Sequence, residues 1–401
     1  MGNGVTGVAK QDVDNALGIM ASSPCIPQAE RRESVRVDVL RSPLKLGKRR
    51  DRVAALVGQL VVNLKEQGLV TLNDQRSVGH PSILSSQGQG DESTGVELGR
   101  ANQYGGFVAV SITPELRAQA WRDADAAADH SRVVVRVLRT IEQFDEGRYV
   151  FDEVWPTEPG GTEISAHLTK ALVHAGAYMG GAYADDRIIG ATLGVVGRSR
   201  VHDGWHTHLH SHVAAVLPGF ADRGVGAAMK IHQRAWALEN DLDRIEWTFD
   251  PLVRRNAKFN LAKLGGVGAQ YIEDFYGQMN DAVNANDRSD RIVLGWDIAS
   301  DRVAGAMRGE LKPQPRVDWL ARGAEVALAV SDSNGPQVQS TSASVQLVAL
   351  PEDIVAIRQH DPQAALGWRY AVREVLQPII AAGGALVGVT QEGDYVVEAA
   401  S

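Results

Sequence analysis

Cysteine is nearly absent from this chain: among its 401 residues, Cys25 is the only one. A single cysteine excludes a disulfide within the chain and a metal site built from several thiolates. Long apolar runs are missing too, because no stretch approaches the ~18–20 residues that a membrane-spanning helix needs. The first twenty residues hold no continuous apolar segment of the kind found in secretory signals. We therefore expect a cytoplasmic protein that does not use a membrane.

Positive charge is also in deficit. Lys and Arg total 41 against 49 Asp and Glu, a net charge of −8, which argues against broad nucleic-acid binding. One segment departs from this balance, because residues 31–52 (RRESVRVDVLRSPLKLGKRRDR) carry nine Lys or Arg. We interpret it as a solvated basic arm; a patch for nucleic acid or an acidic partner is the alternative.

The chain divides into three expected parts. Residues 1–106 form an N-terminal extension, partly disordered, with the basic arm and one helix over 50–71. Residues 107–300 form a compact domain, and residues 301–401 form a C-terminal α+β extension. In the second part, runs typical of strands alternate with runs typical of helices. We therefore expect an α/β fold with a mixed central β-sheet flanked by helices.

Individual elements follow from local signals. Thr113 followed by Pro114 predicts a helix start, and residues 177–183 and 188–196 predict a hairpin. A strand over 206–217, a turn and a helix over 226–240 come next, then a strand over 244–250 and a helix over 256–265. In the C-terminal part we expect strands over 315–330 and 342–351, one helix over 351–382 that begins with Pro351, and a hairpin over 384–398.

Four of the eleven histidines, His206, His208, His210 and His212, occupy every second position of the strand over 206–217. Strict alternation would place all four on one face, with Ser211 and Val213 on the other. Four ligands along one strand span ~20 Å, too far for one tetrahedral site, so we expect no bound metal. The histidines are either a polar strand face or, for His210 and His212, part of a catalytic site.

A glycine turn follows this strand. In FADRGVGAAMK (220–230), Gly224 and Gly226 stand between the strand and the helix. Backbone N–H groups at such a helix start bind anions such as a pyrophosphate. The third glycine of a Rossmann fingerprint and the Lys-Ser/Thr of a P-loop are both missing. Glycine that serves helix packing alone remains the alternative.

The stretch VLPGFADRGVGAAM (216–229) resembles the coenzyme A signature of the GNAT acyltransferase superfamily, a strand ending V-x-P followed by (R/Q)-x-x-G-x-(G/A). The resemblance implies a GNAT fold. It departs at Ala221, where the family has Arg or Gln, and at Leu261, where it has a Tyr that protonates the leaving thiolate. It implies that coenzyme A is bound by Val216, Leu217, Pro218, Arg223, Gly224, Val225, Gly226, Ala227 and Asn256.

Residues 131–398 also resemble a bacterial GNAT subgroup that accompanies N-acylamino-acid racemases, some of whose members are regarded as amino-acid N-succinyltransferases. This resemblance implies an enzyme that transfers an acetyl or succinyl group from acetyl-CoA or succinyl-CoA to the amine of a small molecule, an amino acid being the expected acceptor. Transfer would be direct, in a ternary complex. A homodimer is an open alternative to a monomer.

Amine acyl transfer needs a base and an acid. We expect the base among His210, His212 and Glu246, and the acid at Tyr276; the alternatives are cross-strand pairing for Glu246 and aromatic packing for Tyr276. In this family a backbone N–H near Leu217 would stabilise the oxyanion. The competing function is a non-catalytic acyl-CoA-binding regulatory protein, suggested by Leu261 and the basic arm.

Overall fold

The computed structural model describes residues 111–155, 162, 164–201, 204–277 and 288–400, all within one compact unit, Ser93–Ser401. Cys25, the basic arm and the helix expected over 50–71 lie outside the described residues. Within these ranges, every helix is too short or too polar to cross a membrane.

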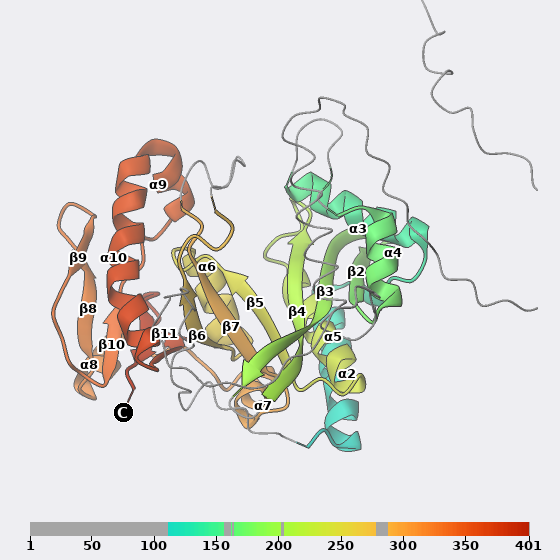
Figure 1. Cartoon of the computed structure of the whole chain (residues 1–401), viewed down its shortest axis with the longest axis horizontal. Helices are drawn as coiled ribbons and strands as arrows, with labels where there is room; N and C mark the ends of the chain where they lie inside the picture. Colours follow the sequence, from blue (N-terminus) through green and yellow to red (C-terminus); the bar gives the residue numbers. More distant parts are fainter. Residues whose placement is uncertain (1–110, 156–161, 163, 202–203, 278–287, 401) are drawn as a thin grey trace, which may run out of the picture. The chain divides into compact units, whose positions relative to one another are not determined.

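One twelve-stranded sheet organises the described residues, in the order β1-β2-β3-β4-β5-β7-β6-β11-β12-β10-β8-β9 (Figure 1). Two neighbouring pairs, β4–β5 and β8–β10, are parallel and the others are antiparallel. The sheet is therefore mixed, and the expected α/β class is confirmed. Its strands are β1 Val134–Val137, β2 Tyr178–Ala184, β3 Arg187–Val201, β4 Gly204–Val216, β5 Arg244–Phe249, β6 Val267–Ile272, β7 Arg291–Asp297, β8 Glu325–Val330, β9 Pro336–Val338, β10 Val345–Val348, β11 Ala385–Val389 and β12 Tyr395–Glu398.

Helices cover both faces of the sheet around β2 to β5. On one face, Ala235 and Leu238 of α5 pack with Leu209 of β4 and Ile245 of β5. On the other, α3 and α4 enclose a separate apolar cluster that includes Phe144. The helical elements are α2 Pro114–Ser131, α3 Ile141–Val154, α4 Ala166–His174, α5 Val225–Glu239, α6 Arg254–Ala257, the π-helix η1 Lys258–Lys263, α7 Asp301–Met307, α8 Arg316–Ala321, α9 Ile354–His360 and α10 Pro362–Ala381.

Where the sequence carries a clear helix cap or hairpin pattern, the structure contains the expected element. The Thr113 side chain accepts a hydrogen bond from the Leu116 N–H and caps α2, with Pro114 in its first turn. The β2–β3 hairpin turns at Asp185 and Asp186, which both adopt the left-handed conformation, a conformation that Asp tolerates better than most residues. The hairpin of β11 and β12 is also confirmed.

Two expectations in the C-terminal part are wrong. Residues 315–330 are not all strand, because α8 comes first and ends before Gly323, whose positive φ stops the helix. Residues 351–382 are two helices, and Pro351 lies outside both. The second starts at Pro362 with Asp361 as its cap, since proline lacks the N–H needed to continue the first.

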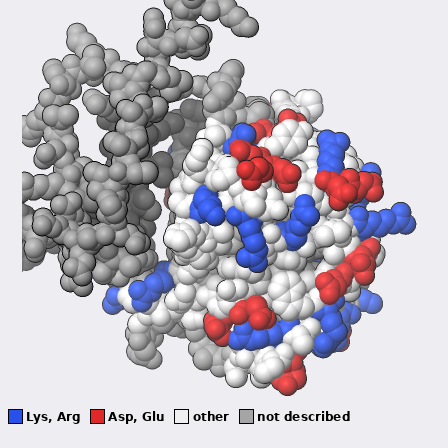
Figure 2. Space-filling model, turned by 90° about the vertical axis from the view of Figure 1, so that its right-hand side faces the viewer, with Lys and Arg blue, Asp and Glu red and all other residues white. Residues whose placement is uncertain are grey.

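Charged side chains of both signs share the face seen in Figure 2, in small interspersed groups. Such mixing is typical of a solvated surface.

Candidate functional site

The parallel strands β4 and β5 meet over a short distance and then separate (Figure 1). Their register joins Leu209 to Ile245 and His210 to Glu246, whereas β4 continues to Val216. On the other edge of β4, the Leu217 N–H donates to the Ile189 carbonyl at 2.8 Å. Antiparallel pairing alternates direction, so the backbone groups of Val216 turn away from β3, toward β5. The end of β4 therefore presents backbone donors and acceptors along an open edge.

Two backbone N–H groups lie near the expected oxyanion donor, those of Val216 and Leu217. The Leu217 N–H donates its hydrogen bond to the Ile189 carbonyl of β3. The backbone N–H that points toward the gap between β4 and β5 is therefore that of Val216. The Leu217 side chain is buried in the apolar cluster of α3.

A β-bulge interrupts the histidine ladder. In the pairing with β3, Leu193 faces Val213 while Gly194 faces Ser211, which leaves His212 as the extra residue. Ser211 therefore lies against α5, where its Oγ accepts a hydrogen bond from Lys230, and Val213 packs on the opposite face against the α3 cluster. The expectation that strict alternation continues through His212 is wrong.

The turn after β4 leads into an uncapped helix. Gly219, Asp222 and Gly224 have positive φ values of 86°, 64° and 86°. Gly224 is the N-cap of α5 and makes no side-chain capping bond. The first intrahelical bond runs from the Ala228 N–H to the Gly224 carbonyl, so the N–H groups between these residues have no partner within the helix. This helix start has the polarity and the donors to bind an anion.

Gly226 lies in the first turn of α5, and a Cβ placed there would meet no atom within 4 Å. The side chains of Val225 and Ala227 are buried, whereas Pro218 and Arg223 are exposed, with the Arg223 guanidinium over the ring of Phe220. The expected coenzyme-binding residues from 216 to 227 thus lie together along the end of β4, the turn and the helix start.

Asn256 lies in α6, on a different element, and is half-buried. Leu261, at the position where the resemblance implies a tyrosine, is fully buried within the π-helix. Arg254 donates to the Leu350 carbonyl, so it serves the packing of the C-terminal part.

His208 and Glu246 belong to a buried polar group between β3, β4 and β5. The His208 Nε2 is 3.4 Å from the Glu246 carboxylate, and Ser199 contacts both side chains at 3.3 Å. Arg244 holds Glu246 at 2.7 Å. Burial raises the pKa of Glu246, but the charge of Arg244 and the hydrogen bonds outweigh it and leave the pKa below its usual value. Glu246 is therefore a fixed carboxylate in this group.

His210 differs from its neighbours in the ladder. His206 pairs with Asp243 at 2.9 Å, whereas His210 lies beside Glu246 in register and 6.3 Å from His212, ring centre to ring centre. Burial, together with the charges of His212 and His208, lowers the pKa of His210 to about 4, so its imidazole is neutral at neutral pH. Among the described residues, no three His, Cys, Asp or Glu side chains group as metal ligands.

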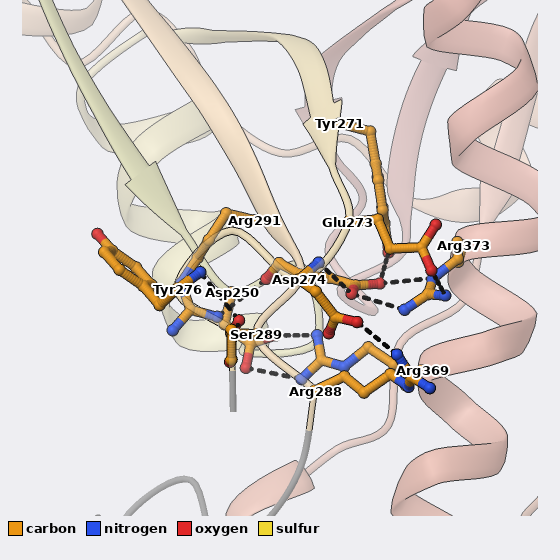
Figure 3. Close-up of polar contacts among 12 residues, drawn as sticks. Asp250, Tyr271, Glu273, Asp274, Tyr276, Arg288, Ser289, Arg291, Arg369 and Arg373 are labelled. Atoms are coloured by element: carbon orange, nitrogen blue, oxygen red, sulfur yellow. Dashed lines mark hydrogen bonds and ion pairs between the residues drawn. The ribbon is translucent and has the colours of Figure 1, made fainter. Parts of the chain in front are cut away.

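Tyr276 lies near the end of β5, where its hydroxyl is 3.2 Å from the Thr248 Oγ1 and Arg291 stacks over its ring. Close by, Asp250 is buried and held by Arg369 at 2.7 Å and 3.0 Å, as well as by Arg358. Figure 3 shows this chain of acidic and basic side chains running from Tyr276 to Arg373. Asp250 is thus a structural carboxylate, whereas the Tyr276 side chain is 47% exposed and accessible.

Lys230 was missed by the sequence reasoning. It lies on α5 with 6% exposure, between Ser211 of β4 and the ring of Trp247 of β5. A signal was present, because Lys230 stands three residues after Ala227 and so shares the buried face of the helix.

Comparisons with known proteins give partial likenesses. No family model matches the sequence, and no curated protein sequence matches it. Several solved structures are similar over about two fifths of the chain, each at a TM-score near 0.3. Naa50 of Arabidopsis thaliana in complex with a bisubstrate analogue is 14% identical, with 41% of this chain and 97% of that one covered and a TM-score of 0.31. The GNAT-family acetyltransferase of Streptococcus pneumoniae is 13% identical (41% and 97% covered, TM-score 0.32), and the ribosomal-protein-S18-alanine N-acetyltransferase of Escherichia coli is 12% identical (42% and 95%, TM-score 0.32). Similarity at this level does not indicate what this chain does.

Proposed function

We propose that this protein is a GNAT-type N-acyltransferase that moves an acyl group from a coenzyme A thioester to an amine. The observation that supports it is the continuity of two binding features over residues 214–227. The open edge of β4 suits the amides of a pantetheine arm, and the uncapped start of α5 suits a pyrophosphate. The signature VLPGFADRGVGAAM (216–229) overlaps these residues.

The proposed reaction takes place where β4 and β5 separate, with His210 as base, the Val216 N–H as oxyanion donor and Tyr276 as acid. The amine would approach from the face of His210, whose neutral imidazole accepts its proton. The amine nitrogen then attacks the thioester carbon, and the Val216 N–H stabilises the oxyanion. The nitrogen of the tetrahedral intermediate still carries one proton more than the amide product. When the C–S bond breaks, Tyr276 donates its proton to the leaving thiolate and regains one from this nitrogen, so coenzyme A leaves as a thiol and the amide is neutral. The acceptor that we propose is an amino acid, with acetyl-CoA or succinyl-CoA as donor.

A tryptophan at Gly226 tests where the coenzyme binds. A Cβ at Gly226 would meet no atom within 4 Å, so we expect Gly226→Trp to fold and its indole to fill the proposed pyrophosphate site. We expect the Kd for acetyl-CoA, measured by isothermal titration calorimetry, to rise at least ~100-fold. Gly367→Trp in α10 is the matched control, because a Cβ there also meets no atom within 4 Å. Equal weakening in both variants, or none in Gly226→Trp, would refute this site.

A non-catalytic acyl-CoA-binding protein is the second candidate, favoured by Leu261, which is fully buried where the family has its acid. Release of free thiol separates the two functions. The protein is mixed with acetyl-CoA or succinyl-CoA and a panel of D- and L-amino acids. Acceptor-dependent release supports the enzyme, while tight coenzyme binding without release from any acceptor supports the binding protein.

A further inference from the structure

The last turn of α2 lies beside the start of α5. The two helices pack side by side (Figure 1) and run in opposite directions, because Arg117, near the start of α2, pairs at 2.6 Å with Asp241, just after the end of α5. At the other end, Ala128 of α2 packs in one apolar cluster with Val225 of α5 and Phe220 of the glycine turn. This cluster holds the end of α2 against the proposed pyrophosphate site.

Ser131, the last residue of α2, places a hydroxyl at this contact. Ser131 is 8% exposed, and its Oγ lies 2.7 Å from the position that a Cβ of Gly224, the N-cap of α5, would occupy. Within the part of the chain that the structure describes, this hydroxyl makes no hydrogen bond. Buried polar groups are ordinarily hydrogen-bonded, so the Ser131 hydroxyl indicates a polar ligand at the start of α5.

His130 adjoins the same place. Its Cδ2 is 3.8 Å from the same Cβ position, and its side chain is exposed in the last turn of α2. The side chains of the glycine turn supply few donors there: Ala221 has none, and the Arg223 guanidinium lies over the ring of Phe220, 4.9 Å from its centre. The end of α2 therefore brings a hydroxyl and an imidazole to a helix start whose first N–H groups have no partner within the helix.

We propose that His130 and Ser131 bind the pyrophosphate of the coenzyme together with the N–H groups at the start of α5, so that α2 forms a second wall of the coenzyme site. This inference rests on the proposed coenzyme site. The hydroxyl and an imidazole N–H each donate to an ionised phosphate oxygen, and hydrogen bonds to charged acceptors are shorter and stronger than those between neutral groups. The positive end of α5 favours the same oxygens.

The test compares coenzyme A with dephospho-coenzyme A, which keeps the pyrophosphate but lacks the phosphate on the ribose. Both are titrated by calorimetry into the wild type, Ser131→Ala and His130→Ala, without any acceptor. A hydrogen bond to a charged group is commonly equivalent to about 10- to 100-fold in affinity. We expect Ser131→Ala to raise the Kd of both ligands about 10-fold, and His130→Ala, whose side chain is exposed, about 3- to 10-fold. His174→Ala is the matched control with an unchanged Kd, because His174 is an exposed histidine in the last turn of α4.

The outcomes distinguish this inference from the proposed function. Unchanged Kd values in both α2 variants overturn the role of α2 and leave the coenzyme site intact. A loss for coenzyme A without a loss for the dephospho form assigns the contact to the ribose phosphate and also overturns this inference. Absence of binding of either ligand to the wild type overturns both proposals. Alanine is the best helix former, so both variants should keep α2, which thermal denaturation without ligand checks; if Ser131→Ala does not fold, the exposed His130 decides.

Discussion

Burial and pairing give each histidine of β4 a different character, although the four look equivalent in the sequence. His206 and His208 have carboxylate partners on β5 or just before it, while His210 is half-buried near two other imidazoles, and its pKa is lowered. Residue spacing predicted that all four share a face, which the bulge at His212 contradicts. The partners that distinguish their roles come from other strands and cannot be identified from the local sequence.

Replacing His210 tests the proposed base. His210→Gln should lower kcat for amine acylation about 100-fold or more, because glutamine cannot accept the proton. In the wild type the base is lost only when His210 becomes protonated, so the acidic limb of the kcat profile should fall near pH 4 rather than 6.5. The measurement is thiol release between pH 4 and 9. An acidic limb near 6.5 that disappears in His212→Ala would assign the base to His212 instead.

Sequence reasoning selected Gly224 and Gly226 as candidates for the coenzyme site and passed over the buried Lys230, for one physical reason. Gly224 and Gly226 lie at the N-terminal end of α5, and their two-residue spacing between a strand and a helix is a local sequence pattern. The buried environment of Lys230 is formed by Ser211 and Trp247, which lie on two other strands. Lysine is ordinarily a solvated residue.

At the scale of elements, the β4–turn–α5 unit was predictable to within two residues at each end. The glycine-rich turn before α5 gives a clear boundary, whereas Pro351, the expected start of a helix, lies outside both helices that follow it. The β-bulge at His212 was not predictable, because it depends on the register with β3. The sequence pattern predicts a strand over residues 315–321, but this segment includes helix α8. The helix is anchored by the double hydrogen bond of Arg316 to Asp394, which lies 78 residues away.

The turn before α5 depends on the conformation of Gly224. Its φ of +86° is unfavourable for any residue with a Cβ, and a Cβ there would lie 2.7 Å from the Ser131 Oγ. We expect Gly224→Ala to lower the free energy of unfolding by about 1–3 kcal/mol. Gly226→Ala, whose site is open and helical, should raise it by about 0.5–1 kcal/mol. Urea denaturation of both variants measures the difference. The same effect in both variants would contradict this role for Gly224.

At the scale of the whole described unit, one sheet runs from β1 to β9, and a buried ion network joins its middle to the C-terminal helices. Arg358 of α9 and Arg369 of α10 both bind Asp250, directly after β5. Arg373 of α10 binds Asp290, directly before β7 (Figure 3). These contacts hold the C-terminal segment against the ends of β5 and β7, beside Tyr276. The network was not foreseeable, since its members are more than 80 residues apart.

Asp250 is the centre of this network, and its loss should be severe. Asp250→Asn leaves two buried guanidinium groups without a counter-charge, so we expect the free energy of unfolding to fall by about 3–5 kcal/mol. Asp274→Asn is the control: this carboxylate pairs with the half-exposed Arg288, and its removal should change stability by less than about 1 kcal/mol.

The pH dependence gives an independent check on the same carboxylate. Burial raises the pKa of Asp250, but Arg369 and Arg358 outweigh it and hold the pKa far below its ordinary value of 3.8. A lowered pKa in the folded state means that the stabilisation is fully present above pH 3.8 and declines as the pH falls below it. The advantage of the wild type over Asp250→Asn in urea denaturation should therefore be constant from pH 7 to about pH 5 and shrink below pH 4. An advantage that already falls between pH 7 and pH 5 would show that a group with a higher pKa, not Asp250, controls the attachment of α9 and α10.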